Sequence, residues 1–174
     1  MAAYAGGDVS AFERLYERYR GPLYRYILRQ VGDAATANDL YQGSWEKIIR
    51  ARGKYRASAP FKAWMYRIAH NHLVDHFRRN RPTAELSPEH IASGNPGPEQ
   101  LTMGAQAAAG LAAAVQLLPP EQREALLLKL ESGLDLKSIS EVTGVNPETA
   151  KSRLRYALGK LRSSLAATHE ETGS

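Results

Sequence analysis

The chain of 174 residues contains no cysteine, which excludes disulfide bonds, thiolate zinc sites and thiol switches. It also lacks a long apolar run, because the least polar stretch, residues 107–118, is too short and too rich in alanine to span a bilayer. The first residues show no basic-then-apolar secretion signal. No alternating pattern of any length predicts a strand. These absences favour a helical protein of the cytoplasm.

Charge of one sign is missing from two segments. Residues 82–118 contain no lysine or arginine, and residues 151–162 contain five of these bases and no acid. The whole chain has 23 bases and 18 acids, a net charge of +5, whereas residues 1–81 hold 15 bases and 7 acids, a net of +8. Two basic zones on either side of an acidic segment are typical of a protein that holds nucleic acid at two places.

The N-terminal part shows helical periodicity. Ser10 and Glu13 form a capping box that predicts the start of the first helix. Gly21-Pro22 is expected to interrupt that helix before a second one that ends at Gly32. A third helix turns a regular apolar face inward and carries a polar stripe on its other side, which is either a docking surface or simply solvated. The stripe consists of Asp39, Gln42, Glu46 and Arg50.

A short basic loop, residues 50–58, leads through Pro60 into a fourth helix that runs to about Arg79. Aromatic rings and cations stand side by side here, and rings stack on unpaired bases while cations meet phosphates. An amphipathic helix with surface arginines fits the spacing equally well. The candidates for contact with an unpaired strand are Lys54, Tyr55, Arg56, Ser58, Lys62, Tyr66, His70, Asn71 and Arg78.

Four prolines between residues 81 and 98 predict an extended linker. Beyond it we expect an alanine-rich helix over residues 99–118 and a helix over residues 121–132. In the second of these, Leu126, Leu127 and Leu130 are predicted to point inward. The predicted fold class is therefore all-α. Two small helical domains, residues 1–80 and 99–174, are joined by a flexible linker, and the C-terminal domain ends in a helix-turn-helix.

The helix-turn-helix is predicted over residues 135–156, with a tight turn at Gly144 and a basic second helix that begins at Pro147. Leu154, Leu158 and Leu161 form the stripe expected to be buried. The remaining surface is expected to face base edges and phosphates of the major groove. Its residues are Glu148, Thr149, Lys151, Ser152, Arg153, Arg155 and Tyr156, and for Arg153 the alternative is an ion pair with Glu141 across the turn.

Four segments, in this order and at these separations, resemble the bacterial RNA polymerase sigma factors of the extracytoplasmic-function (ECF) type, within the sigma-seventy family. The resemblance covers roughly residues 8–166. The segments are Asp39-Leu-Tyr-Gln-Gly-Ser-Trp45, the Phe61–Arg79 helix, Leu118-Pro-Pro-Glu-Gln-Arg123 and Thr149-Ala-Lys-Ser-Arg-Leu-Arg155. The family pattern differs at Gly43, where an acid is usual, and at Ala150, where a larger aliphatic residue is common. A weaker clamp contact and looser packing of the recognition helix are expected from these two differences.

The resemblance also implies roles and partners. The helix of residues 39–50 would dock on the clamp helices of the largest subunit of core RNA polymerase. The loop of residues 52–60 and the helix of residues 61–79 would recognise and open the minus-ten element of promoter DNA. The C-terminal domain would read the minus-thirty-five element and contact the flap of the second-largest subunit. Factors of this family are commonly held inactive by an anti-sigma factor.

Other functions fit the residues less well. His70, His72 and His76 are close in sequence, but the glutamate of the helical zinc-protease motif is absent, so we expect no metal, cofactor or catalytic residue. The chain could instead be a stand-alone helix-turn-helix regulator that binds DNA unaided. It could also be a sigma mimic that sequesters an anti-sigma factor, although such mimics usually carry a receiver domain for which this chain has no room.

Overall fold

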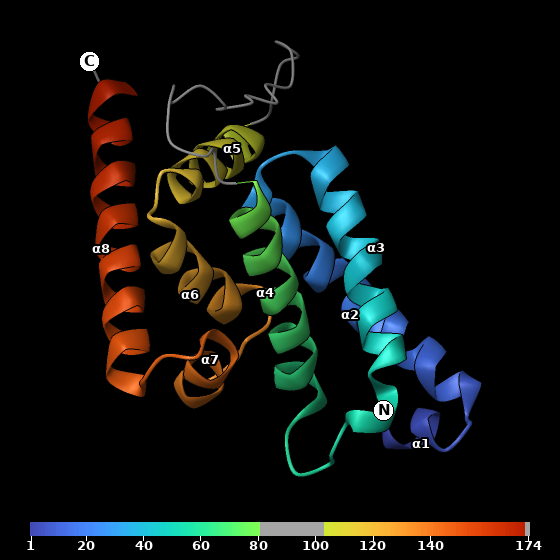
Figure 1. Ribbon diagram of the computed structural model, residues 1–174. Coiled ribbons are helices and arrows are strands. Elements are labelled where there is room, and N and C mark those ends of the chain that lie inside the picture. Colours follow the sequence, from blue (N-terminus) through green and yellow to red (C-terminus); the bar gives the residue numbers. More distant parts are fainter. Residues whose placement is uncertain (81–102, 173–174) are drawn as a thin grey trace.

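The computed structural model describes residues 1–80 and 103–172, and every secondary-structure element in these ranges is a helix. The predicted linker of residues 81–98 lies outside the described residues. The helices form two groups, which pack directly against each other (Figure 1). The N-terminal group contains α1 (Ala2–Ala5), α2 (Val9–Val31), α3 (Ala34–Arg50), the 3-10 turn η1 (Arg52–Lys54) and α4 (Phe61–Arg79). The C-terminal group contains α5 (Met103–Gln116), α6 (Pro120–Leu130), α7 (Leu136–Thr143) and α8 (Pro147–Thr172). The all-α prediction is confirmed.

Helix α2 corrects two details predicted for its sequence. Its N-cap is Asp8, whose carboxylate accepts a hydrogen bond from the Ala11 N–H at 3.2 Å, while the Ser10 hydroxyl donates to that same carboxylate. The capping box was therefore placed too late. The helix also continues through Pro22 without a break. A proline inside a helix costs about 3 kcal/mol, and the full burial of the next turn, which includes Leu23 and Ile27, offsets that cost.

The inward face predicted for α3 is confirmed, because Ala37, Leu40, Trp45 and Ile48 are buried. Asp33 caps this helix by accepting a hydrogen bond from the Thr36 N–H at 2.8 Å. The preceding helix ends at Gly32 with a φ of +86°, a left-handed conformation that glycine adopts without strain. Two cap signals in a row thus fix the turn between α2 and α3.

Helix α6 is buried more widely than its sequence predicted. Leu126 and Leu127 are buried as expected, but Leu130 is 58% exposed and Leu128 is buried in its place. The reason is that α6 packs against α8 and also against α2 of the other group. A helix covered on two sides buries consecutive residues, so the single inward stripe was the wrong pattern for it.

The helix-turn-helix is present as predicted. Gly144 takes a φ of +69° between α7 and α8, and Asn146 accepts a hydrogen bond from the Thr149 N–H at 2.8 Å, which caps α8. The buried stripe of α8 differs from the prediction, because Leu158 is 41% exposed whereas Ala150 and Ala157 are fully buried. Small side chains seven residues apart let α8 approach its neighbours closely at these two positions.

Candidate nucleic-acid interface

The polar stripe on α3 lies opposite the buried face of that helix. Asp39, Gln42, Glu46 and Arg50 are all exposed, and Arg50 lies 3.7 Å from Glu46 in an ion pair one turn away. Exposure leaves the stripe free to dock on a partner, and it is equally consistent with a solvated face.

Gly43 interrupts this stripe, and the structure gives a reason for it. A Cβ atom at residue 43 would lie 2.5 Å from Cε1 of the His72 ring, which is too close for two carbons. The His72 ring is half-buried, and its Nδ1 lies 3.3 Å from the hydroxyl of the buried Ser44. Burial, followed by the nearby Lys47, lowers the pKa of His72. A ring from α4 therefore fills the space that a side chain at residue 43 would need.

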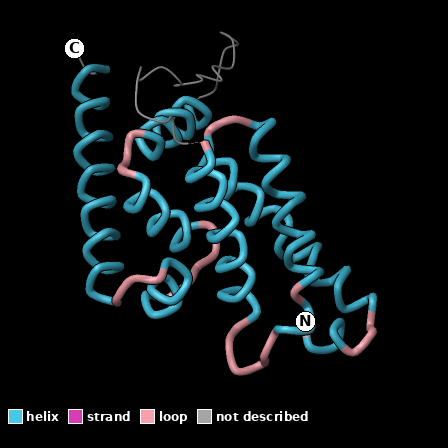
Figure 2. The backbone as a smooth tube through the Cα atoms, in the orientation of Figure 1, coloured by secondary structure: helices cyan, strands magenta, loops and turns pink. Residues whose placement is uncertain are grey.

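The loop between α3 and α4 lies toward the lower end of the view in Figure 2, as does the turn between α7 and α8. Lys54, Arg56 and Ser58 are exposed in this loop. Tyr55 is held in place, because its hydroxyl donates a 3.0 Å hydrogen bond to the Ala59 carbonyl and its ring packs edge-on against Trp64. The loop thus presents exposed cations beside a tyrosine ring that is held in place.

The residues predicted on α4 have different surroundings from one another. Asn71 and Arg78 are exposed and Lys62 is half-buried. Tyr66 is fully buried and packs edge-on against Tyr26 of α2, so the prediction that it lies on the polar side of α4 is wrong for this arrangement. Burial raises the pKa of the Tyr66 phenol, and its hydroxyl has no hydrogen-bond partner within the described residues.

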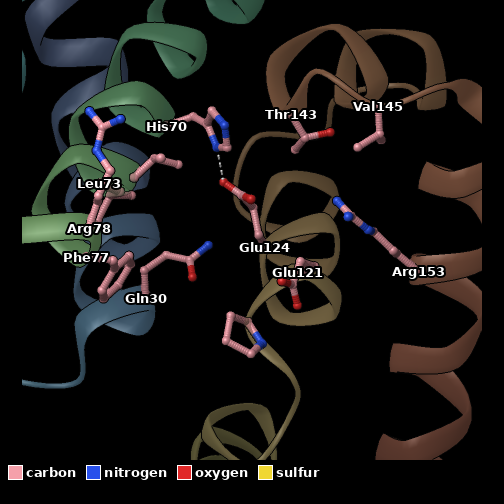
Figure 3. Close-up of a pocket in the computed structure, with 12 residues that line it drawn as sticks. Gln30, His70, Leu73, Phe77, Arg78, Glu121, Glu124, Thr143, Val145 and Arg153 are labelled. Atoms are coloured by element: carbon pink, nitrogen blue, oxygen red, sulfur yellow. Dashed lines mark hydrogen bonds and ion pairs between the residues drawn. The ribbon is translucent and has the colours of Figure 1, made fainter. Parts of the chain in front are cut away.

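His70, a further residue on α4, points into a cavity of about 480 Å³ between α4 and the C-terminal helices (Figure 3). Its Nδ1 lies 2.5 Å from a carboxylate oxygen of Glu124 on α6. Arg153 of α8 also lines this cavity and points into it from the opposite side. Among the ion pairs of the described residues, none joins Arg153 to Glu141, so the alternative considered for Arg153 is not found.

The other predicted residues of α8 lie on the outer surface or at its edge. Glu148, Lys151, Arg155 and Tyr156 are exposed. Lys151 lies 3.9 Å from Glu148, and the Arg155 guanidinium lies over the Tyr156 ring at 5.2 Å. Thr149 and Ser152 are half-buried. The exposed cations stand on the first turns of the second helix, where a helix-turn-helix reads DNA.

Comparison with known proteins decides the family. Residues 15–83 match Sigma-70 region 2, and residues 109–161 match Sigma-70, region 4. The ECF RNA polymerase sigma factor BldN of Streptomyces coelicolor is 34% identical over 86% of this chain, which spans 58% of the length of BldN. The ECF RNA polymerase sigma factor SigE of Mycolicibacterium smegmatis is 32% identical over 97% of this chain and 68% of its own. The chain belongs to the ECF sigma factors.

A solved structure shows that the fold of this sigma factor is also that of the family. The sigma factor RpoE from Bartonella quintana, crystallised with the anti-sigma factor NepR, superposes with a TM-score of 0.75. The alignment has 21% identity and covers 91% of this chain and 98% of that one. The family resemblance drawn from the four sequence segments is confirmed by the region 2 and region 4 matches and by the relatives above 30% identity.

Two further properties concern the described part of this sigma factor. No group of three or more histidines and acids there is placed to hold a metal ion. Within the same residues, no helix has both the length and the apolar character needed to cross a membrane.

Several residues that join the two helix groups of the sigma factor were not predicted from its sequence. Glu124 of α6 and Glu131, the residue directly after α6, bind side chains of the N-terminal group, and Gln116 and Arg123 bind its backbone. Arg123 lay within a segment that carries the family resemblance. The two glutamates had no sequence signal, because their partners lie up to 106 positions away along the chain.

Proposed function

We propose that this sigma factor binds core RNA polymerase and directs it to a specific set of promoters, with its two helix groups contacting two separate promoter elements. The observation that carries the proposal is the exposed polar stripe on α3 in a region 2 domain that is followed by a complete helix-turn-helix in region 4. The stripe supplies the docking surface for the clamp helices of the largest subunit, through Asp39, Gln42, Glu46 and Arg50. The C-terminal domain contacts the flap of the second-largest subunit.

Opening of the minus-ten element is assigned to the loop after α3 and to α4. A base that leaves the stack costs roughly a few kcal/mol, least when it is already unpaired. Exposed cations and aromatic rings offset this cost by binding the freed strand. No bond is made or broken in this step, so the protein acts without catalytic residues and without a cofactor. The exposed cations Lys54 and Arg56 are the first candidates for contact with the strand.

Recognition of the minus-thirty-five element is assigned to the first turns of α8. The N-terminal end of a recognition helix enters the major groove, where side chains reach base edges. Glu148, Thr149, Ser152 and Arg153 follow one another around these turns, and Tyr156 continues the same side. Lys151 and Arg155 are exposed beside them and are assigned to phosphates.

An anti-sigma factor is part of the proposal. The Bartonella quintana relative was crystallised with such a partner, and the two proteins share a fold. Because core RNA polymerase and promoter DNA are in the cytoplasm, the proposed function assigns the protein to the cytoplasm.

The test is transcription in vitro from genomic DNA with core polymerase, with and without the protein. We expect start sites that appear only when it is present. Asp39→Arg should abolish recruitment, whereas Glu13→Arg, an exposed acid on α2, should not. Arg155→Glu should weaken use of the minus-thirty-five element more than Arg162→Glu, which is exposed further along the same helix. A protein that binds operators alone and directs no initiation would be a stand-alone regulator instead.

A further inference from the structure

The polar stripe on α3 has a gap at its centre. Residues 39, 43, 46 and 50 follow one another at steps of three or four, so they lie on the same side of the helix. Asp39, Glu46 and Arg50 place exposed side chains there, whereas Gly43 has no side chain. The surface proposed to dock on core polymerase therefore lacks a side chain of α3 at its middle.

A side chain from another helix occupies this gap. Helix α4 packs against α3, and one edge of the His72 ring lies over Gly43. A Cβ atom at residue 43 would be 2.5 Å from Cε1 of this ring and 3.3 Å from its Nε2. The imidazole therefore takes the place of the side chain that Gly43 lacks. Helix α4 thus contributes one residue to a surface that is otherwise built from α3.

Ser44 holds the ring by its other nitrogen. The buried hydroxyl of Ser44 lies 3.3 Å from Nδ1 of His72. A serine in a helix can donate its proton to a carbonyl one turn earlier, as Ser163 does to Gly159. No such bond is found for Ser44 in the described residues, so its hydroxyl can donate to Nδ1 instead. The neutral ring then carries its own proton on Nε2.

The surroundings of the ring keep it neutral at pH 7. Burial is the main cause that lowers the pKa of His72 below its ordinary value of 6.5, and the nearby cations Lys47 and Arg79 lower it further, as does His76. Asp75 acts in the opposite direction and is outweighed. Within the described residues, the hydrogen bonds of the ring are limited to Nδ1. A partner that meets the stripe at Gly43 would therefore find a single N–H donor.

We propose that His72 belongs to the surface that docks on core polymerase, where its Nε2–H donates a hydrogen bond to an oxygen acceptor of the clamp helices. This inference rests on the proposed function, because it adds a residue to the docking surface assigned there. It gives α4 a second role beside its contact with the minus-ten element. It also explains Gly43, since any side chain at residue 43 would displace the ring.

The test measures the affinity of the full chain for core polymerase by fluorescence anisotropy. The chain has no cysteine, so a dye can be placed on Ser163→Cys, an exposed position of α8. His72→Ala should raise the Kd about 10-fold, the loss expected for one hydrogen bond. The matched control is His76→Ala, because His76 is also half-buried and lies one turn further along α4, and its Kd should be unchanged. A folded His72→Ala protein with the wild-type Kd overturns the proposal.

Two amide variants separate the hydrogen bond from the fold. The amide of a glutamine reaches about as far as Nε2 of a histidine, whereas the amide of an asparagine reaches only about as far as Nδ1. His72→Gln should therefore keep the Kd within about 3-fold of the wild type, and His72→Asn should raise it about 10-fold. Both variants remove the ring, so a purely structural role would change both affinities alike. Equal affinities for the two variants overturn the proposal.

Substitution of residue 43 should have opposite effects in two backgrounds. With His72 present, Gly43→Gln forces the ring out of the gap and should weaken binding to core polymerase. In a His72→Ala background the new side chain meets no ring and places an amide in the gap from α3 itself. It should then recover most of the affinity lost in His72→Ala. If Gly43→Gln weakens binding equally in both backgrounds, His72 does not replace the missing side chain.

Transcription distinguishes docking from contact with DNA, because α4 is also assigned to the minus-ten element. With core polymerase held constant, His72→Asn should need about 10-fold more sigma factor for half-maximal initiation. At saturating sigma factor it should match the wild type in rate and in start sites. A lower rate at saturation would place His72 at the DNA and overturn the proposal.

The same measurements separate a failure of this inference from a failure of the proposed function. If the wild type does not bind core polymerase or directs no initiation, the proposed function is wrong. If the wild type binds and Asp39→Arg abolishes binding, while every His72 variant binds like the wild type, the α3 stripe docks as proposed. Only the role of His72 is then wrong.

Discussion

The contact between Gly43 and His72 makes a quantitative prediction for a double-mutant cycle. Replacing a glycine inside a helix by alanine gains about 1 kcal/mol. The new Cβ, however, would lie 2.5 Å from the His72 ring, and overpacking of this kind costs roughly 1–3 kcal/mol. We therefore expect Gly43→Ala to lower the free energy of unfolding by about 1 kcal/mol, the difference between these two effects.

The same substitution should have the opposite sign once the ring is removed. In a His72→Ala background the cost disappears, so Gly43→Ala should raise the free energy of unfolding by about 1 kcal/mol. The coupling energy between the two positions is then roughly 2 kcal/mol, well above the value for independent sites. Urea unfolding followed by circular dichroism gives each free energy.

A matched control is available in α8. A Cβ at Gly159 meets no atom within 4 Å, so Gly159→Ala should be stabilising by about 1 kcal/mol in both backgrounds. If Gly43→Ala shifts stability by the same amount with and without the imidazole, to within about 0.5 kcal/mol, the steric explanation for the glycine is refuted.

Four further predictions each concern a single position. Tyr26→Phe removes a hydroxyl that donates to Glu124 and should destabilise the protein by about 1 kcal/mol. Tyr66→Phe removes a buried hydroxyl without a partner in the described residues and should be neutral or stabilising in the same urea titration, and a larger loss for Tyr66 than for Tyr26 would contradict the structure. The hydrogen bond from the backbone N–H of Thr36 lowers the pKa of Asp33, so this cap stabilises α3 above the ordinary pKa of 3.8 and the gain is lost as pH falls through the lowered value. Asp33→Ala should therefore be less stable than the wild type at pH 7 and approach the wild-type stability in acid. Asp33→Asn, which still caps the helix, should show a smaller loss of stability at pH 7. Parallel curves of stability against pH for the wild type and Asp33→Ala would count against the cap. Gly144→Ala places a side chain at a φ of +69° and should cost roughly 1–2 kcal/mol in thermal or urea unfolding, and an unchanged stability would show that the turn adopts another conformation.

Local signals in the sequence determined the helices and the helix-turn-helix motif. The α3 face from Ala37 to Ile48, the span of α4 and the left-handed turn at Gly144 all followed from periodicity and turn chemistry. These features depend on residues within a few positions of one another, so one stretch of chain contains all the information. The same holds for the four segments that identified the family.

Local sequence patterns predicted the structure wrongly at positions where a distant part of the chain packs against the helix. The break expected at Pro22 did not occur, because the packed turn after it outweighs one lost hydrogen bond. Leu130 is exposed and Leu128 is buried because α6 has neighbours on two sides. Tyr66 is buried although its position on α4 matched the polar side, since a tyrosine ring suits either environment.

The sequence by itself determined which surfaces this sigma factor has, and the tertiary structure decided which of them are open. Periodicity shows that a helix has an apolar face, but it does not show which distant segment packs against the other faces of that helix. In the sequence, Glu124 and Glu131 are two ordinary acids, and only the fold brings their partners on α2 and α4, 54 to 106 positions away, beside them. Burial and pairing arise only when these distant segments pack together, and they make the two side chains contacts between the two helix groups.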